Sequence, residues 1–198
     1  MKTHTLSQRM ILFCSIAFLG LAADLWTKST MFSILGLPHE AQQYVDWWVI
    51  DDFFGFQTAV NQGALFGMGQ GAVILFRIFS AVALVAIGYW FIRAEGWKSL
   101  WLTICLSAIS AGILGNLYDR FGLWHPHAGF TDQFPNYAYG VRDFILFTYR
   151  GHVWPNFNIA DCLLVCGAVM LAIFSFRSDG SARHTKPLTD VPDPSDCN

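Results

Sequence analysis

Two aspartates occupy positions where they could do acid–base chemistry: Asp143 in GVRDFI and Asp161 in PNFNIADCLL. Both lie beside apolar stretches, and ionisable side chains at membrane depth are costly, so they are usually kept for catalysis or transport. Two carboxyl groups held together in a low-dielectric pocket cannot both ionise easily and therefore share one proton. The ionised member can then take a proton from water while the protonated member polarises a carbonyl group. We predict that Asp143 and Asp161 form such a catalytic pair.

Asp161 also has a structural explanation. The segment WPNFNIAD predicts a helix start, because Pro155 and Asn156 interrupt the preceding chain and Asn158 is followed three residues later by Asp161, as in a capping box. An acidic side chain in the first turn is also stabilised by the helix dipole. Capping explains one acid, but it does not explain Asp143.

Further polar residues are candidates for the wall of a site around this pair. Asn61 and Gly63 in NQGALFGM predict a backbone turn that offers an amide side chain to the site. In AISAGILGNLYDR, the residues Asn116, Asp119 and Arg120 share one helix face because they are three or four positions apart. They form either a satisfied internal network or a wall of the site. Small residues on the same helix permit close packing: Ala108, Ala111, Gly112 and Gly115.

Two other groups of residues favour structure over catalysis. Asp24 and Lys28 are four residues apart at the end of the first apolar stretch, which predicts an ion pair on one helix face. His125 and His127 in WHPHAG could begin a metal site, but neither an HExxH motif nor a Cys/His quartet accompanies them. We therefore predict no metal ion and no cofactor.

The elements that position these residues are predicted to be membrane helices. Hydrophobic residues make up 54% of the 198-residue chain and charged residues 13%, and the mean hydropathy is +0.41. A soluble domain carries roughly 25% charged residues. Four apolar stretches approach the ~20 residues that cross a bilayer: 10–26, 72–92, 100–117 and 159–176. We predict an all-α membrane protein with four transmembrane helices in one domain, residues 1–177.

The positive residues predict how these helices are oriented, because Lys and Arg near helix ends stay on the cytoplasmic side. Seven of them lie at the ends that four crossings would place on one face: Lys2, Arg9, Arg93, Lys98, Arg177, Arg183 and Lys186. Four lie on the other side: Lys28, Arg120, Arg142 and Arg150. This pattern predicts cytoplasmic termini, with loops 29–71 and 118–158, and the site, outside. The first stretch could instead be a cleaved signal peptide, which would leave three spans at odds with these charges.

The remaining segments carry weaker signals. In the first outer loop, VDWWVIDDFFGFQTAV predicts one or two short strands that form a small extracytoplasmic hairpin or sheet. The polar tail, 178–198, predicts a disordered cytoplasmic segment. Cys162 and Cys166 share a helix face and could suggest a thiol oxidoreductase, but we interpret them as small apolar filler. The net charge of −2 offers no footprint for nucleic acid.

Together these residues resemble the lipoprotein signal peptidase family, signal peptidase II, which comprises intramembrane aspartyl peptidases of bacteria. The resembling blocks occur in family order across residues 10–177: Asp24 with Lys28, NQGALFG, GILGNLYDR, VRDFI and FNIAD. The resemblance implies that Asp143 and Asp161 are the catalytic pair. It also implies that four residues line the site and help to hold the pair or the substrate backbone: Asn61, Asn116, Arg120 and Asn158.

The same resemblance implies a substrate, a prolipoprotein whose lipobox cysteine carries diacylglycerol and which is cut on the amino side of that cysteine. We expect a monomer in the bacterial inner membrane that acts at the extracytoplasmic boundary, where the acyl chains remain in lipid. Leu65 replaces a residue that is usually small, Arg142 replaces an apolar one, and the stretch 122–139 is longer than usual. These departures bear on substrate preference and loop closure.

A different class of protein competes with this interpretation. In a four-helix membrane carrier or channel, Asp143 and Asp161 would bind a cation or relay protons. Such a protein is expected to carry polar residues on several helices through the bilayer midplane. Here Arg77, inside the second span, is the only charge expected near a midplane, and the other polar residues gather at the outer ends. The sequence therefore favours the peptidase.

Overall fold

The computed structural model describes residues 5–38, 47–63, 72–126, 132 and 135–183. This part of the chain is mostly helical, and four of its helices are long and apolar enough to cross a membrane. They are α1 (Leu6–Leu35), α2 (Val73–Ile92), α3 (Leu100–Arg120) and α5 (Ile159–Arg183). Each contains or closely matches one of the four predicted spans.

Three helices extend beyond the ends predicted for them; α3 does so only slightly, to Arg120, and α1 and α5 by more. α1 begins with a capping box, in which the Gln8 amide donates to the Thr5 hydroxyl and the Thr5 amide donates to the Gln8 side chain. It continues to Leu35, so the first part of the predicted loop 29–71 is helical. α5 continues to Arg183, past the predicted start of a disordered tail at 178, and residues 184–198 lie outside the described part.

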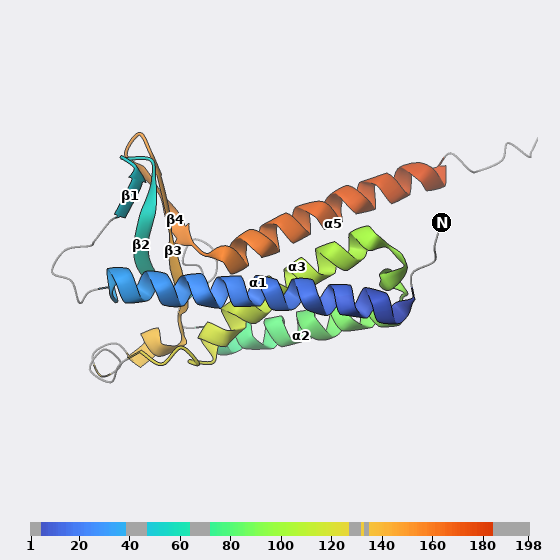
Figure 1. The fold of residues 1–198 in the computed structure, drawn as a ribbon, viewed down its shortest axis with the longest axis horizontal. Helices are drawn as coiled ribbons and strands as arrows, with labels where there is room; N and C mark the ends of the chain where they lie inside the picture. Colours follow the sequence, from blue (N-terminus) through green and yellow to red (C-terminus); the bar gives the residue numbers. More distant parts are fainter. Residues whose placement is uncertain (1–4, 39–46, 64–71, 127–131, 133–134, 184–198) are drawn as a thin grey trace, which may run out of the picture.

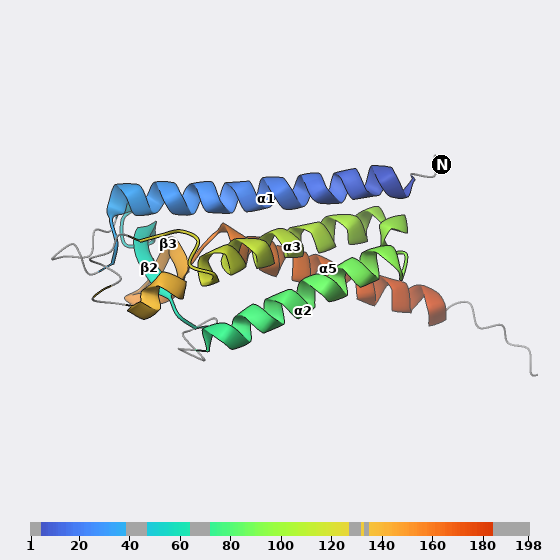
Figure 2. The same ribbon diagram turned by 90° about the horizontal axis from the view of Figure 1, so that it is seen from below.

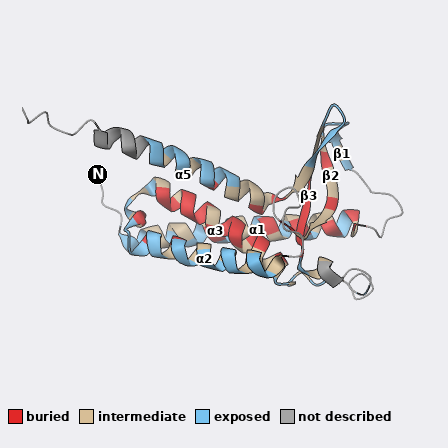
Figure 3. Ribbon diagram, turned by 180° about the vertical axis from the view of Figure 1, so that it is seen from behind, coloured by how far each residue is buried: buried red, intermediate tan, exposed pale blue. Residues whose placement is uncertain are grey.

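α3 is the central helix of the bundle. It packs against α1, α2 and α5, which lie around it in Figures 1 and 2. In its most apolar stretch 67% of the residues are buried, against 0% in that of α2 and 11% in that of α5. Figure 3 shows the same contrast along the two helices, with buried residues throughout α3 and exposed residues along α2. Polar side chains on α3 are therefore shielded by its neighbours.

Two glycines allow the neighbouring helices to approach α3 closely. A Cβ atom at Gly112 would collide with the Ala160 carbonyl oxygen and the Leu164 side chain. A Cβ atom at Gly115 would collide with the Asp24 carboxylate. The packing role predicted for the small residues of this helix is confirmed at these two positions.

A four-stranded antiparallel sheet lies at one end of the bundle, away from the N-terminus and from the end of α5 at Arg183 (Figure 1). Its strands follow the order β1 (Trp47–Ile50), β2 (Phe54–Asn61), β3 (Val141–Tyr149) and β4 (His152–Phe157). β1 and β2 come from the segment between α1 and α2, where one or two strands were predicted. β3 and β4 come from the segment between α3 and α5, where none was predicted. The sheet therefore joins two hairpins far apart in the sequence.

The register of β2 and β3 places Asn61 and Asp143 at the end of the sheet nearest the helices. Asp143 pairs with Ala59, and Val141 pairs with Asn61. A hydrophobic cluster centred on Phe32, Phe144 and Ile145 packs the sheet against the end of α1. The start of β3 is therefore fixed between the helix bundle and the turn that follows β2.

Candidate active site

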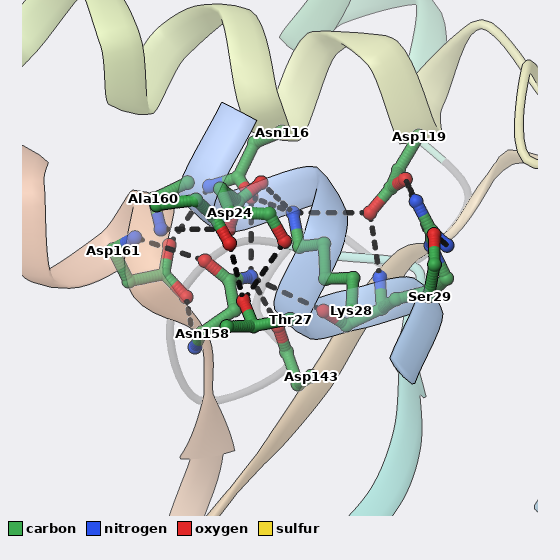
Figure 4. Close-up of polar contacts among 12 residues, drawn as sticks. Asp24, Thr27, Lys28, Ser29, Asn116, Asp119, Asp143, Asn158, Ala160 and Asp161 are labelled. Carbon is green, nitrogen blue, oxygen red and sulfur yellow. Dashed lines mark hydrogen bonds and ion pairs between the residues drawn. The ribbon is translucent and has the colours of Figure 1, made fainter. Parts of the chain in front are cut away.

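The structure brings the two predicted acids together, with Asp143 buried and Asp161 half-buried. Asp143 lies near the start of β3 and is 2% exposed, and Asp161 lies in the first turn of α5. Asn158, immediately before α5, is fully buried. Figure 4 shows Asn158 between the two aspartates, so that a strand and a helix start each contribute one carboxyl group.

Asn158 hydrogen-bonds to both acids. Its Nδ2 donates to Asp143 Oδ1 at 2.6 Å and to Asn116 Oδ1 at 3.1 Å. Its Oδ1 accepts from the Asp161 amide at 2.9 Å, and its own amide donates to Asp161 Oδ2 at 3.3 Å. The last two bonds confirm the predicted capping box. Asp161 therefore caps its helix and faces the site at the same time, so the structural and chemical explanations are compatible.

Asn116 connects the pair to α3. Its Nδ2 donates to Asp161 Oδ1 at 2.8 Å, and its Oδ1 accepts from Lys28 Nζ at 3.1 Å. The oxygen also accepts the bond from Asn158. Both ends of this amide are satisfied in the buried interior, as a preorganised site requires. Asn116 is thus part of a satisfied internal network that also contacts one of the two acids, so the two alternatives left open by its position on the helix are compatible.

Four charged side chains form a buried row beside the pair, which we name the ionic row: Asp24, Lys28, Asp119 and Arg142. Lys28 Nζ lies 2.7 Å from Asp24 Oδ2 and 3.1 Å from Asp119 Oδ2, and all three side chains are 0% exposed. Arg142 Nη2 lies 2.8 Å from Asp119 Oδ1. The predicted Asp24–Lys28 ion pair is confirmed, and it belongs to a larger group with two positive and two negative charges.

Asp24 also fixes the helix that carries Asp161. The Ala160 amide at the start of α5 donates to Asp24 Oδ1 at 2.8 Å. The first amides of a helix have no partner within the helix, and a carboxylate there is favoured by the helix dipole. α1 therefore holds the start of α5 in place beside α3.

The turn after β2 forms another side of the site. The Gly63 amide donates to Asn61 Oδ1 at 2.9 Å, and Arg120 Nη2 donates to the Gly63 carbonyl at 3.0 Å. Asn61 also hydrogen-bonds to the Asp143 side chain. The turn predicted from Asn61 and Gly63 is therefore present, and it offers an amide to the acid as expected. Leu65, in the same sequence block, lies outside the described residues.

The expected position of Arg77 near the bilayer midplane is wrong. Arg77 lies close to the start of α2, where its Nε donates to the Arg120 carbonyl at 2.7 Å and its Nη2 donates to the same oxygen. Its guanidinium lies 5.2 Å from the Phe121 ring centroid and 5.0 Å from that of Tyr139. A cation at a helix C-terminus is favourable, so Arg77 caps α3 at the same end of the bundle as the site.

The environment of Asp143 changes its acidity. Burial raises the pKa of the Asp143 carboxyl well above its ordinary value, and the nearby charge of Asp161 raises it further. The Lys28 charge and hydrogen bonds from Asn158 and Asn61 oppose this shift without cancelling it. A carboxyl in this setting retains a proton at a pH where an exposed one has lost it.

The histidines considered for a metal site do not join this centre in the described chain. His125 is exposed and adopts φ 48°, and His127 lies outside the described residues. In the ranges that the structure describes, no three His, Cys, Asp or Glu side chains are grouped so as to hold a metal ion.

Sequence reasoning missed two contributors to the site. Arg142 was noted as a departure from a family pattern, whereas it is buried and paired with Asp119. The Ala160 amide, which binds Asp24, gives no signal in its residue type. The charge balance of the buried row gives a clue to Arg142, because Asp24 and Asp119 carry two negative charges and Lys28 only one positive charge.

Four helices long and apolar enough to cross a membrane, with two acids and a buried ionic row at one end of their bundle, are typical of a membrane-embedded protein. The sequence pattern of the family described as signal peptidase (SPase) II matches residues 16–177. The lipoprotein signal peptidase of Rhodopirellula baltica is 45% identical over 171 residues, which cover 86% of this chain and 74% of that protein. The lipoprotein signal peptidase of Clostridium novyi is 36% identical over 163 residues, which cover 82% of this chain and 95% of that protein.

A solved bacterial membrane enzyme, determined by the in meso method at 2.3 Å resolution, has the same fold. It matches with a TM-score of 0.69 and 27% identity, covering 89% of this chain and 93% of its own. The chain belongs to the signal peptidase II family, and it is therefore an aspartic peptidase of that type. This membership disfavours the carrier or channel considered from the sequence.

Proposed function

We propose that this protein removes signal peptides from diacylglyceryl-modified prolipoproteins, with Asp143 and Asp161 as its catalytic pair. The family and the names of its relatives support the substrate class. The observation that carries the residue assignment is the position of Asn158, which hydrogen-bonds to both carboxyl groups. Asn158 donates to the Asp143 carboxyl from its side chain and to the Asp161 carboxyl from its backbone, so both acids meet at one residue and can titrate as a pair.

The two acids are suited to different tasks. The raised pKa of Asp143 makes it the member that keeps the shared proton near neutral pH. Both oxygens of Asp161 accept hydrogen bonds, one from Asn116 and one from the Asn158 amide, so its carboxyl group is held in place, and the proton-accepting role is left to it. Asp161 is therefore the general base and Asp143 the general acid in the first step.

In that step Asp161 takes a proton from a water molecule whose oxygen attacks the scissile carbonyl carbon. Asp143 gives its proton to the carbonyl oxygen, which produces a neutral tetrahedral diol. The carbon–nitrogen bond then breaks as Asp161 passes its proton to the leaving amine and one diol hydroxyl returns a proton to Asp143. The pair ends in its starting state.

We place this site at the extracytoplasmic face of the bacterial inner membrane, with both termini in the cytoplasm. The site and sheet lie at one end of the bundle, and Arg9, Arg93 and Lys98 lie toward the other. Lys28 and Arg142, which counted against this orientation in the sequence, are neutralised by Asp24 and Asp119. At this boundary the acyl chains of a substrate remain in lipid while its peptide reaches the acids.

The test uses purified protein in detergent with two precursors of one sequence, one diacylglyceryl-modified and one unmodified. We expect mass spectrometry to detect cleavage on the amino side of the modified cysteine and much slower cleavage of the unmodified precursor. Equal cleavage of both would overturn the lipid requirement. Activity that is lost on chelation and restored by zinc would overturn the aspartyl mechanism, since the pair needs no metal.

A further inference from the structure

Arg142, the residue before Asp143, is held by Asp119 through both its side chain and its backbone. Its Nε and Nη2 donate to Asp119 Oδ1 at 3.0 and 2.8 Å, and its backbone amide donates to Asp119 Oδ2 at 3.0 Å. The residue is 4% exposed. A single carboxylate on α3 therefore fixes the start of β3 by three hydrogen bonds.

The remaining groups of Arg142 have partners from other elements. Nη1 donates to the Ser29 hydroxyl of α1 at 3.3 Å, and the guanidinium carbon lies 5.4 Å from the ring centroid of Trp124. The Arg142 carbonyl accepts from Asn158 Nδ2 at 3.3 Å, and the same nitrogen donates to Asp143. The side-chain amide that binds Asp143 therefore also contacts Arg142.

We propose that Arg142 is a positioning residue: by binding Asp119 it fixes the start of β3 against α3, and so sets where the Asp143 carboxyl lies relative to Asp161. This inference rests on the proposed function, because it takes these two acids as the reacting groups. Arg142 acts through Asp119 and Asn158 and is not assigned contact with the substrate. It is thus distinct from the polar wall around the pair.

The geometry explains why an arginine serves this purpose. The guanidinium presents five donors in a rigid plane, and here it reaches Asp119 and Ser29 while one face covers Trp124. A lysine would keep the charge opposite Asp119 but lose the planar arrangement and about two of the five donors. An apolar side chain would leave Asp119 to share the charge of Lys28 with Asp24, in a buried row that carries an excess negative charge.

The experiment compares Arg142→Met and Arg142→Lys with a matched control, Lys98→Met, which removes one positive charge from the exposed pair with Glu95. Cleavage of the diacylglyceryl-modified precursor is measured as kcat and KM per folded molecule. We expect Arg142→Met to lower kcat about 10- to 100-fold with KM within about twofold of wild type, because small misplacements of reacting groups are costly. Arg142→Lys should recover part of the loss, and Lys98→Met should match wild type.

Unchanged kcat per folded molecule in Arg142→Met would overturn the proposal, as would unchanged kcat in Arg142→Lys if the methionine variant does not fold. A double-mutant cycle with Asp119→Asn tests whether Arg142 acts through its contact with Asp119. If both residues act through one contact, the double variant loses no more kcat than the more damaging single variant. Additive losses would overturn the route through Asp119.

A second readout does not depend on activity. Hydrogen exchange of peptides that cover β3 should be faster in Arg142→Met than in wild type, while peptides from α2 should be unchanged. Unaltered protection of β3 would overturn the proposal. If wild-type protein cleaves no lipidated precursor, the proposed function fails, and the exchange result alone then decides whether Arg142 fixes the strand.

Discussion

The ionic row and the proposed catalytic pair lie side by side, yet their charges are balanced in different ways. In the row, Lys28 lies within 3.1 Å of both Asp24 and Asp119, and Arg142 lies 2.8 Å from Asp119. In the pair, Asp143 and Asp161 are held by the amide groups of Asn158 and Asn116. Amides orient a carboxyl group without neutralising it. The row is therefore suited to fix helices, and the pair is suited to move a proton.

The largest expected effect separates the two groups by chemistry. Asp143→Asn and Asp161→Asn should each abolish cleavage of a lipidated precursor, by about 10⁴-fold, because neither amide can exchange a proton as the acid does. Both variants should remain folded, since Asn keeps the shape and the hydrogen bonds that the amides of the site can make. Turnover near the wild-type rate in either variant would show that the pair is not catalytic.

Removing the side chain of Asn158, the residue that hydrogen-bonds to both acids, should have the next largest effect. Asn158→Ala should lower kcat about 10²- to 10³-fold, as when a preorganised donor is removed from an active site. Asn156→Ala is the matched control, because Asn156 lies on β4 and donates to the Gln57 carbonyl at 2.8 Å. Kinetics of the two variants measured together should differ by at least tenfold. Equal effects would mean that Asn158 supports the sheet rather than the pair.

The row should show its effect in stability. Lys28→Met leaves Asp24 and Asp119 buried with less positive charge, and breaking a buried ion pair in this way costs about 3–5 kcal/mol of unfolding free energy. Lys98→Met disrupts an exposed pair and should cost less than about 1 kcal/mol. Thermal unfolding in detergent compares the two. Similar melting temperatures would contradict a structural role for the row.

The smallest expected effect is that Asp143→Asn becomes more stable relative to wild type as the pH rises. Because the pKa of Asp143 is raised in the folded protein, the unfolded chain releases this proton above about pH 4 while the folded protein keeps it. Wild type therefore loses stability as pH rises toward neutral, and Asp143→Asn does not. Each unit of raised pKa corresponds to about 1.4 kcal/mol, or about 3–6 °C in Tm. A Tm difference that stays constant from pH 4 to 7 would contradict this.

The sequence predicted those parts of the fold that depend on local pattern. Long apolar stretches marked the four helices, and the spacing of Asn158 and Asp161 marked the start of α5. The extension of α1 to Leu35 was not predicted, because Lys28 interrupts the apolar run. A lysine is compatible with that buried position only because Asp24 and Asp119 neutralise it, and the second of these comes from another helix.

The sheet and the site could be predicted only in part, because they depend on contacts between residues far apart in the sequence. β3 is buried on both faces from Val141 to Leu146, so its sequence lacks the alternation that identifies a half-exposed strand. The pairing of Arg142 with Asp119 joins elements that no spacing rule connects. The carboxyl pair itself was predictable because apolar surroundings make acids conspicuous, whereas the residues that orient the pair are ordinary in composition.

The bond from the Ala160 amide to Asp24 has a consequence for how the protein comes into being. α1 leaves the ribosome first and α5 last, so Asp24 cannot bind the Ala160 amide until most of the chain has been synthesised. Asp161 reaches Asn116 only when that final helix docks. We therefore expect a nascent or truncated chain that stops before α5 to be an inert protease, because it lacks the proposed general base. We expect peptidase activity to arise only after α5 has been synthesised and has docked against α3.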